Sequence, residues 1–194
     1  QYGTCLKGLL EEGIIDAAGV EDFLREVHDI DYSDIAEDTA LKAVLELVFD
    51  VAPCWVFTAS AREHAQRCLR AVGVDALPWR GIIDTRDCGL ESKHAISSFE
   101  AAMKIAGVTD ATGCLFADDS VKNVRSAKKA GWTTVLVGLY DRDTGAKIEC
   151  PEADAHVASL HGLADLLGLN GHAKAAAPTN GAAAAATVVV DAAC

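Results

Sequence analysis

Apolar residues recur at two different spacings along the chain, and the spacing changes near residue 50. Before that point they repeat at helical intervals among many acidic side chains, as in Leu41, Val44, Leu45 and Val48. From Pro53 onward, short continuous apolar runs alternate with helical patterns that stop at glycines. The pattern therefore predicts two or three short helices, followed by alternating strands and helices.

The alternating part begins with a strand over 54–58 and a helix over 61–72 that ends at Gly73. Further strands are predicted at 81–84, 114–117, 133–137 and 155–158, and further helices at 96–106, 121–130 and 160–167. Strands that alternate with helices of about ten residues form a parallel sheet with helices on both faces. The predicted fold class is α/β.

The composition changes again after Gly171. Eleven of the 22 residues over 173–194 are alanine, and only Lys174 and Asp191 are charged. A segment this biased cannot bury a specific core of its own, so we expect it to be disordered or loosely helical and to lie outside the fold. The predicted organisation is a helical segment over 1–50, an α/β core over 51–170 and an alanine-rich low-complexity tail over 171–194.

Length and charge narrow the classes of partner. The 194 residues suffice for one compact domain with a small appendage. The net charge of −12 argues against nucleic acid, because binding a phosphate backbone requires clustered positive charge. A small phosphorylated substrate needs only one or two local cations. No apolar run approaches the roughly 20 residues of a membrane span, so we expect no membrane partner either.

The seven cysteines indicate a reducing environment. They are odd in number and include no close pair, so the sequence signals neither a zinc site nor a redox dithiol. Cys54 and Cys114 lie inside apolar runs and are expected to be small buried hydrophobic residues. We therefore expect a cytoplasmic protein, with an organelle as the alternative.

Polar side chains follow the predicted strands, at the sheet edge where open parallel sheets bind ligands. Adjacent carboxylates after a buried strand need a nearby cation, and hard oxygen ligands suit Mg²⁺. The same residues could instead cap the helix that begins near Val121. The candidates are Thr58 and Ser60 after the first strand, Asp84 and Asp87 after the second, Lys93 before a helix, and Asp118, Asp119 and Ser120 after the third.

In this order, the threonine, the lysine and the acidic pair resemble motifs two, three and four of the haloacid dehalogenase-like (HAD) phosphohydrolases, over most of residues 1–140. The resemblance implies a Rossmann-like sheet in which Thr58 hydrogen-bonds the substrate phosphoryl group and Lys93 neutralises charge beside the nucleophile. It also implies that Asp118 and Asp119 hold Mg²⁺ and that Asn123 orients the waters of the metal.

The pyrimidine 5′-nucleotidase-like branch of that family is the closer likeness. Residues 2–9 and 23–32 resemble its helical cap, and residues 57–60 and 116–123 resemble its core motifs. Ala59, which the resemblance places beside the substrate phosphate, stands where the branch often has Asn, and His94 stands where Pro is common. Both departures loosen the substrate assignment. The aromatic candidates for stacking on a base are Tyr2, Phe23 and Tyr32.

The first strand of the family and its catalytic motif are not found ahead of the cap. By resemblance, the enzymes of the family carry a nucleophilic aspartate in an Asp-x-Asp motif at the end of that strand. The strand itself would lie between the strands that end at Thr58 and Ala117. Without that strand the sheet has two unpaired edges and an unfilled apolar slot. Because the single methionine is Met103 and the chain begins at Gln1, we expect a fragment of a longer product that is inactive by itself.

Two other segments could supply the aspartate. Asp29 and Asp31 have the right spacing, but the charged residues over 23–28 fit an amphipathic helix better than a buried strand. Residues 187–191 look like a strand that ends in Asp191. To serve, that strand would have to insert into the middle of the sheet, across a linker rich in alanine.

The expected function of the full protein is Mg²⁺-dependent hydrolysis of a small phosphorylated metabolite, a nucleoside monophosphate by resemblance. The alternative is an inactive module that binds phosphate or a partner. Dehalogenation at carbon is a weaker third hypothesis, because the acidic pair implies a metal that this chemistry does not use.

Overall fold

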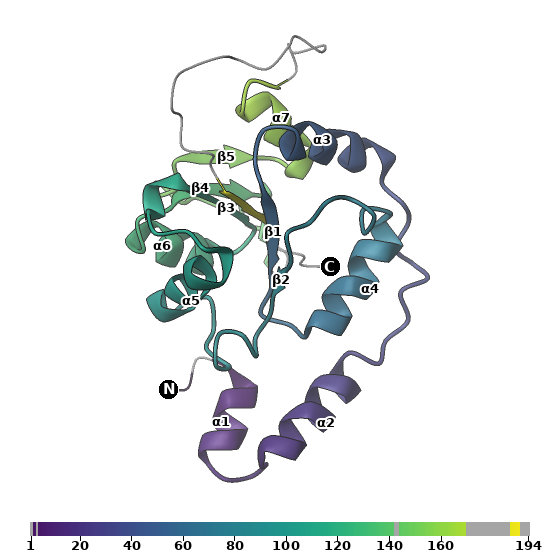
Figure 1. The fold of residues 1–194 in the computed structure, drawn as a ribbon, viewed down its shortest axis with the longest axis vertical. Helices are drawn as coiled ribbons and strands as arrows, with labels where there is room; N and C mark the ends of the chain where they lie inside the picture. The colour runs from purple at the N-terminus through teal and green to yellow at the C-terminus, as the bar shows by residue number, and fades with distance from the viewer. Residues whose placement is uncertain (1, 3, 142–143, 170–186, 191–194) are drawn as a thin grey trace.

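A computed structural model describes residues 2, 4–141, 144–169 and 187–190. Six parallel strands form one sheet in the order β2-β1-β6-β3-β4-β5, so the predicted α/β fold class is confirmed (Figure 1). The strands are β1 (Cys54–Phe57), β2 (Ile82–Ile83), β3 (Cys114–Asp118), β4 (Thr133–Val137), β5 (Ala155–Val157) and β6 (Thr187–Val190). The helices are α1 (Cys5–Glu11), α2 (Ala17–Val27), α3 (Thr39–Phe49), α4 (Arg62–Val72), α5 (Ile96–Ala106), α6 (Val121–Lys129) and α7 (Leu163–Leu166), with short 3₁₀ turns at Ala111–Gly113 and Leu160–Gly162.

Helices pack on both faces of the sheet because the inner strands β1, β6 and β3 are apolar on both sides. Helices α5 and α6 cover one face through Phe99, Ala102 and Ala127. Helices α3 and α7 cover the other through Val48 and Leu163. Alternate residues of β6 enter the two clusters, Val189 on the first face and its two neighbours on the second. The core is therefore built around the middle of the sheet.

Local sequence signals place the helix ends. Helices α4 and α5 both end at a glycine with a left-handed backbone, Gly73 at φ +81° and Gly107 at φ +69°, a conformation that costs residues with a Cβ more. Ser120 is the N-cap of helix α6, and its hydroxyl accepts a hydrogen bond from the backbone N–H of Asn123. These ends agree with the sequence prediction to within a residue or two.

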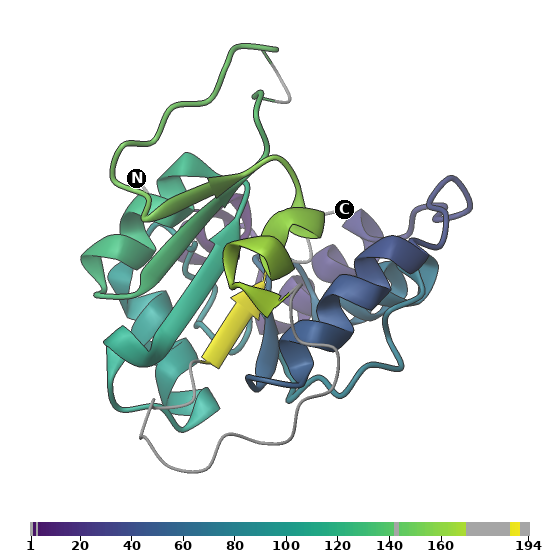
Figure 2. The ribbon, with the colours of Figure 1, turned by 90° about the horizontal axis from the view of Figure 1, so that it is seen from above.

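The expectation that the tail takes no part in the fold is wrong for residues 187–190. Strand β6 lies parallel between β1 and β3, with Val189 opposite Trp55 on one side and Phe116 on the other (Figure 2). Its four residues are 1–5% exposed. A central strand must be apolar on both faces and bonded along both edges, and Thr-Val-Val-Val meets both demands. The central strand is therefore present and not missing.

The rest of the tail, residues 171–186 and 191–194, lies outside the described residues.

The other candidate aspartate pair, Asp29 and Asp31, is not on a strand. Both residues follow helix α2, and the Asp31 carboxylate accepts hydrogen bonds from the backbone N–H and hydroxyl of Ser33, both at 2.9 Å. The amphipathic-helix interpretation of residues 23–28 is confirmed.

Helices α1 and α2 pack on each other at one end of the molecule (Figure 1). Their own small cluster contains Leu6, Val20 and Leu24 together with Ala61 of the core. Helix α3, in contrast, packs against α7 and the sheet. The boundary at residue 50 stays a prediction.

None of the helices within the described ranges combines the length and the apolar character that crossing a membrane requires. Cys54 and Cys114 are buried as expected, at 1% and 2% exposure. Burial raises the pKa of the Cys54 thiol to about 12 and that of Cys114 to about 11.

Candidate functional site at the carboxyl edge of the sheet

Lys93 forms hydrogen bonds with the last residues of the two strands that flank β6. Its side chain is 3% exposed, and its ammonium donates hydrogen bonds to Asp118 Oδ2 at 2.8 Å and to the Phe57 carbonyl at 3.2 Å. Phe57 ends β1 and Asp118 ends β3, and each follows the residue that pairs with Val190. The Lys93 ammonium is therefore held at the carboxyl end of the central strand.

Apolar rings surround this cation. The Lys93 ammonium lies 5.6 Å from the ring centroids of both Phe57 and Phe116. The negative faces of aromatic rings attract a cation, and their bulk excludes water that would screen it. The Lys93 ammonium and its Asp118 partner therefore form an ion pair that water screens little.

Asp118 is enclosed by hydrogen-bond donors. Its Oδ1 accepts from the Ser120 backbone N–H at 2.8 Å and from the Asn123 side-chain amide at 3.0 Å, while Oδ2 accepts from Lys93. A buried carboxylate is stable only when its charge is paired and its lone pairs are satisfied. Asp118 thus positions Lys93 and is itself positioned by Asn123.

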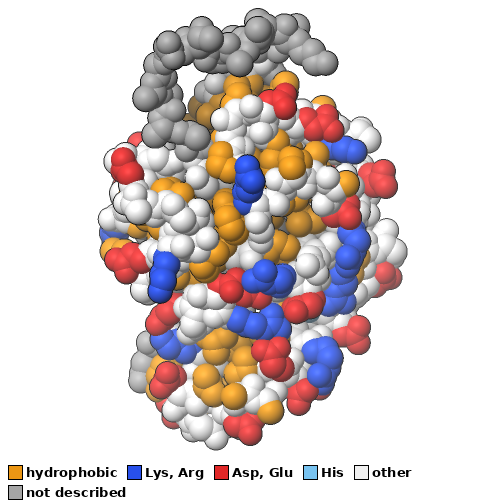
Figure 3. Space-filling model, in the orientation of Figure 1, with side chains coloured by type: hydrophobic (Ala, Val, Ile, Leu, Met, Phe, Trp, Pro, Cys, Tyr) orange, Lys and Arg blue, Asp and Glu red, His pale blue; other side chains and the backbone are white. Residues whose placement is uncertain are grey.

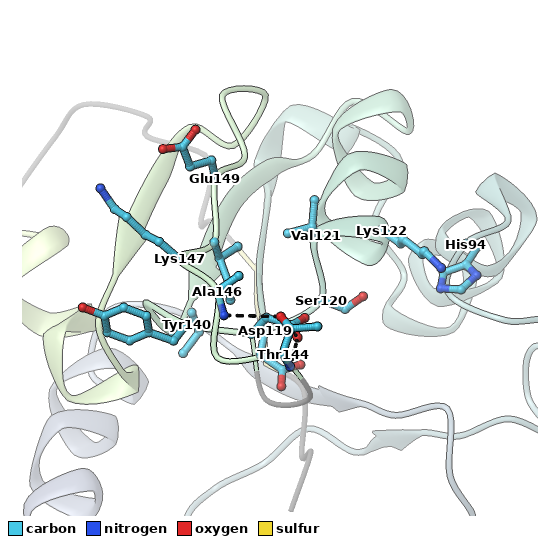
Figure 4. Close-up of a pocket in the computed structure, with 14 residues that line it drawn as sticks. His94, Asp119, Ser120, Val121, Lys122, Tyr140, Thr144, Ala146, Lys147 and Glu149 are labelled. Atoms are coloured by element: carbon cyan, nitrogen blue, oxygen red, sulfur yellow. Dashed lines mark hydrogen bonds between the residues drawn. The ribbon is translucent and has the colours of Figure 1, made fainter.

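Asp119, the next residue, is half-buried. It lines two neighbouring cavities, of about 660 Å³ and about 320 Å³, which share Val137 and Gly138 as well. Figure 4 shows the larger one. Asp118 lines the smaller one. Of the two adjacent carboxylates, Asp119 is therefore the one that lines the larger cavity.

Thr58 and Ala59 follow β1 at the same edge. Thr58 is 3% exposed, its backbone N–H donates to the Ile83 carbonyl at 2.9 Å, and its hydroxyl oxygen accepts from the Ser60 backbone N–H at 3.1 Å. Because the hydroxyl accepts that bond, its own hydrogen can point toward a ligand. Ala59 is exposed. The structure thus brings Thr58, Lys93 and the acidic pair to one edge of the sheet.

Asp84 also follows a strand, but its contacts are structural. Its carboxylate is buried and accepts hydrogen bonds from the backbone N–H groups of Arg62, Arg86 and Asp87, and from the Arg86 guanidinium at 2.9 Å. It organises the turns after β1 and β2. The Phe57 carbonyl contacts Lys93 in the site but could not be predicted, because a backbone acceptor leaves no residue signature.

The aromatic candidates lie elsewhere. Phe23 packs in the α1–α2 cluster, the Tyr32 hydroxyl bonds to His64 Nδ1 at 2.6 Å, and the Tyr2 hydroxyl donates to Glu12. None of the three lines either cavity at Asp119, as far as the described residues go.

The residues that could hold a metal are few. Within residues 2, 4–141, 144–169 and 187–190, no group of three or more His, Cys, Asp or Glu side chains is placed to hold a metal ion. Asp118 and Asp119 supply two carboxylates at the end of β3. A third carboxylate follows β6 in the sequence, Asp191, which lies outside the described residues.

Solved structures resemble this chain at low sequence identity. No protein-family model matches it. A HAD family hydrolase from Deinococcus radiodurans with bound phosphate and sodium aligns with a TM-score of 0.59 and 18% identity, over 88% of this chain and 76% of the other. An L-2-haloacid dehalogenase from Xanthobacter autotrophicus with chloropropionic acid covalently bound aligns with a TM-score of 0.57 and 17% identity, over 79% and 67%.

A third similar structure is a HAD phosphatase from Thermococcus onnurineus, with a TM-score of 0.53 and 16% identity over 84% of this chain and 86% of that one. Phosphatases and dehalogenases thus match about equally well, and the likeness to the pyrimidine nucleotidase branch stays a prediction. What these structures share with the chain is the fold, and the chain accordingly has the fold of the haloacid dehalogenase-like hydrolases.

Proposed function

We propose that this protein hydrolyses phosphate monoesters at the carboxyl edge of its sheet. The observation that carries the proposal is the Lys93 ammonium, buried at the end of the central strand between Phe57 and Asp118. Thr58 leaves β1 at the same edge, and Asp119 leaves β3. A phosphoryl group needs a cation and hydroxyl or amide donors around its oxygens, and Lys93 and Thr58 supply both kinds of contact.

Asp191 is the proposed nucleophile. It directly follows Val190 in the sequence, and Val190 pairs with Val56 and Ala117 at the level just before Lys93. A carboxylate attacks phosphorus, the ester P–O bond breaks, and the departing oxygen takes a proton from water and leaves as an alcohol. Water then cleaves the aspartyl phosphate to inorganic phosphate and restores the carboxylate. The expected inactivity rested on a missing nucleophilic aspartate and its strand; β6 lies in the place of that strand, and Asp191 follows it in the sequence as the candidate aspartate.

Mg²⁺ is the proposed cofactor. Asp118, Asp119 and Asp191 would provide carboxylate oxygens, the ligand type that Mg²⁺ prefers. Bound there, the ion would supply positive charge for the phosphoryl oxygens. The donor set is incomplete without Asp191, so Asp191→Asn should weaken Mg²⁺ binding in titration calorimetry as well as slow turnover.

The proposed substrates are nucleoside monophosphates. The sequence resemblance to the pyrimidine 5′-nucleotidase-like branch supports this choice, and the cavity beside Asp119 offers room for more than a phosphoryl group.

The test is phosphate release from p-nitrophenyl phosphate and from nucleoside monophosphates, with Mg²⁺ and with EDTA. Asp191→Asn, Lys93→Met and Asp119→Asn should each lower kcat/KM by about 10²-fold or more. Asp31→Asn is the matched control, because Asp31 sits in an exposed loop, and it should leave the rate unchanged. A folded chain that binds Mg²⁺ and phosphate without turnover would instead be an inactive binding module. Full activity in Asp191→Asn would exclude that residue as nucleophile.

A second candidate function is dehalogenation at carbon, and the residue that favours it is Ala193. The family resemblance places a second aspartate two residues after the nucleophile, where it protonates the leaving oxygen, and this chain has Ala193 there. A halide leaves as an anion and needs no such proton. Both oxygens of Asp118 also accept hydrogen bonds from protein donors, which stabilise this carboxylate without a metal ion. Chloride release from 2-chloropropionate in EDTA would favour this chemistry, in which the carboxylate attacks carbon.

A further inference from the structure

The larger cavity at Asp119 has a wall that the proposed phosphoryl chemistry does not use. It measures about 660 Å³ and lies between the start of α6 and the segment that follows β4 (Figure 4). Asp119 and Ser120 belong to the first side, and Tyr140 and Ile148 to the second. Small organic ligands occupy sites of roughly 300–1,000 Å³, so the space accommodates a group larger than phosphate.

Tyr140 presents an open aromatic face in this wall. It is 64% exposed, whereas the other aromatic side chains of the described residues are half-buried or buried. An exposed ring on a cavity wall leaves apolar area in water that a planar ligand would cover. The ring therefore has the properties of a stacking platform.

Backbone bonds hold the Tyr140 segment in place. Tyr140 and Lys147 form an antiparallel bridge. The Asp141 N–H donates to the Ala146 carbonyl at 2.8 Å, and the Ile148 N–H donates to the Leu139 carbonyl at 3.0 Å. Such a paired segment fixes the direction of the ring better than an unbonded loop would.

The sheet register sets Tyr140 next to the reactive edge. Strand β4 pairs with β3, with Leu136 opposite Asp118. Asp119 therefore leaves β3 at the level where Val137 ends β4, and Tyr140 comes three residues later. Lys122 and His94 lie on the other side of Asp119 from Tyr140 in Figure 4, where they can donate hydrogen bonds to polar atoms of a ligand.

We propose that this cavity binds a planar heterocyclic ring carried by the substrate, with the ring stacked on Tyr140 and the phosphoryl end directed to Asp119 and Lys93. The inference rests on the proposed function and makes Tyr140 a specificity-determining residue. It places ring recognition on the segment after β4, away from Tyr2, Phe23 and Tyr32.

The first experiment compares two esters, uridine 5′-monophosphate with a ring and glycerol 3-phosphate without one. Tyr140→Ala should raise KM for the uridine ester about tenfold and leave KM and kcat for glycerol phosphate unchanged, since stacking acts only on the ring. Tyr140→Phe keeps the ring and should keep the wild-type KM. Equal effects of Tyr140→Ala on the two esters, or no effect on either, would overturn the proposal.

The second experiment does not depend on turnover. Uridine, which has no phosphate, should bind the wild-type chain and Tyr140→Phe in titration calorimetry, and bind Tyr140→Ala about tenfold more weakly. Ribose is the ligand without the planar heterocyclic base, and Ile14→Ala is the control for loss of an exposed apolar side chain elsewhere, at 68% exposure. If neither ester is hydrolysed but uridine binds through Tyr140, the proposed function fails and the ring site stands. If uridine does not bind the wild-type chain, the ring site is wrong.

Discussion

Strand β6 and the α1–α2 pair come from opposite ends of the chain and differ in how they are held to the rest of the protein. The four residues of β6 are buried and hydrogen-bonded to a neighbour on each side. The α1–α2 pair meets the rest of the protein through a small apolar cluster and through partly exposed ion pairs, Lys7 with Glu91 and Arg86 with Glu21. Figure 3 shows the charged side chains gathered across this boundary.

The difference teaches which part of the molecule folds as one unit. Apolar burial and ladder hydrogen bonds in the centre of a sheet are lost together, so β6 belongs to the global cooperative unit. Exposed ion pairs contribute little each and are screened by salt. We therefore expect the α1–α2 pair to open separately, at a lower free energy than the sheet.

The largest expected effect comes from Val189→Asp. Val189 is 1% exposed in the aromatic core cluster, and an unpaired carboxylate there should cost more than about 4 kcal/mol of unfolding free energy. Urea denaturation, monitored by circular dichroism, measures this free energy of unfolding. Ile14→Asp, at an exposed site near the α1–α2 connection, should change the same quantity by less than about 0.5 kcal/mol. Wild-type stability in Val189→Asp would mean that β6 does not occupy the sheet.

A smaller and local effect is expected from Leu24→Ala in α2. Leu24 is 4% exposed in the α1–α2 cluster, and the cavity should lower the local opening free energy by about 2–3 kcal/mol. Native-state hydrogen exchange should show faster exchange of α2 amides, with β3 amides protected as before. Equal acceleration in β3 would show that the pair and the sheet form one unit.

Arg86→Met tests the polar part of the boundary. The Arg86 guanidinium contacts Glu21 at 2.7 Å, Glu63 at 3.2 Å and the buried Asp84 at 2.9 Å, and its bonds lower the pKa of the Glu21 carboxyl. The expected loss is about 1–2 kcal/mol, chiefly from the buried Asp84 partner. Arg25→Met, which removes the exposed pair with Asp22, is the matched control and should cost almost nothing.

The smallest expected effect is a pH dependence at His64 of α4. Burial, the stacked His28 ring at 4.4 Å and the charge of Arg67 lower the His64 pKa below its ordinary 6.5, and Tyr32 and Cys68 also contact the ring. The folded state thus binds this proton less readily than the open state. The α1–α2 pair should be held most firmly above pH 6.5 and loosen as the pH falls below it.

Hydrogen exchange of α2 amides at pH 7.5 and pH 5.5, corrected for intrinsic rates, measures this dependence. His64→Gln should reduce it, whereas His161→Gln, which removes a half-exposed histidine bonded to Asp38, should not. An unchanged pH dependence in His64→Gln would assign the effect to other groups.

Much of the site could be predicted because its residues share one simple property. Thr58 follows the buried strand β1 and Asp118 ends the buried strand β3. Parallel strands bring such positions to the same edge of the sheet. Lys93 reached the same edge through a side chain long enough to cross the end of β6. The roles of the Phe57 carbonyl and of Tyr140 could not be predicted, because a backbone acceptor and a segment between strands carry no periodic signal.

Local pattern alone determined where the strands and helices lie: helix α5 and strand β4 have the predicted bounds, since apolar spacing and glycine stops act over a few residues. Only the tertiary structure decided that β6 fills the centre of the sheet. The strand pattern over residues 187–190 is visible in the sequence, but a four-residue run beyond an alanine-rich segment carries no local signal that assigns its place in the sheet. Its position is set instead by β1 and β3, whose edges and apolar faces required a partner that neighbouring sequence did not provide.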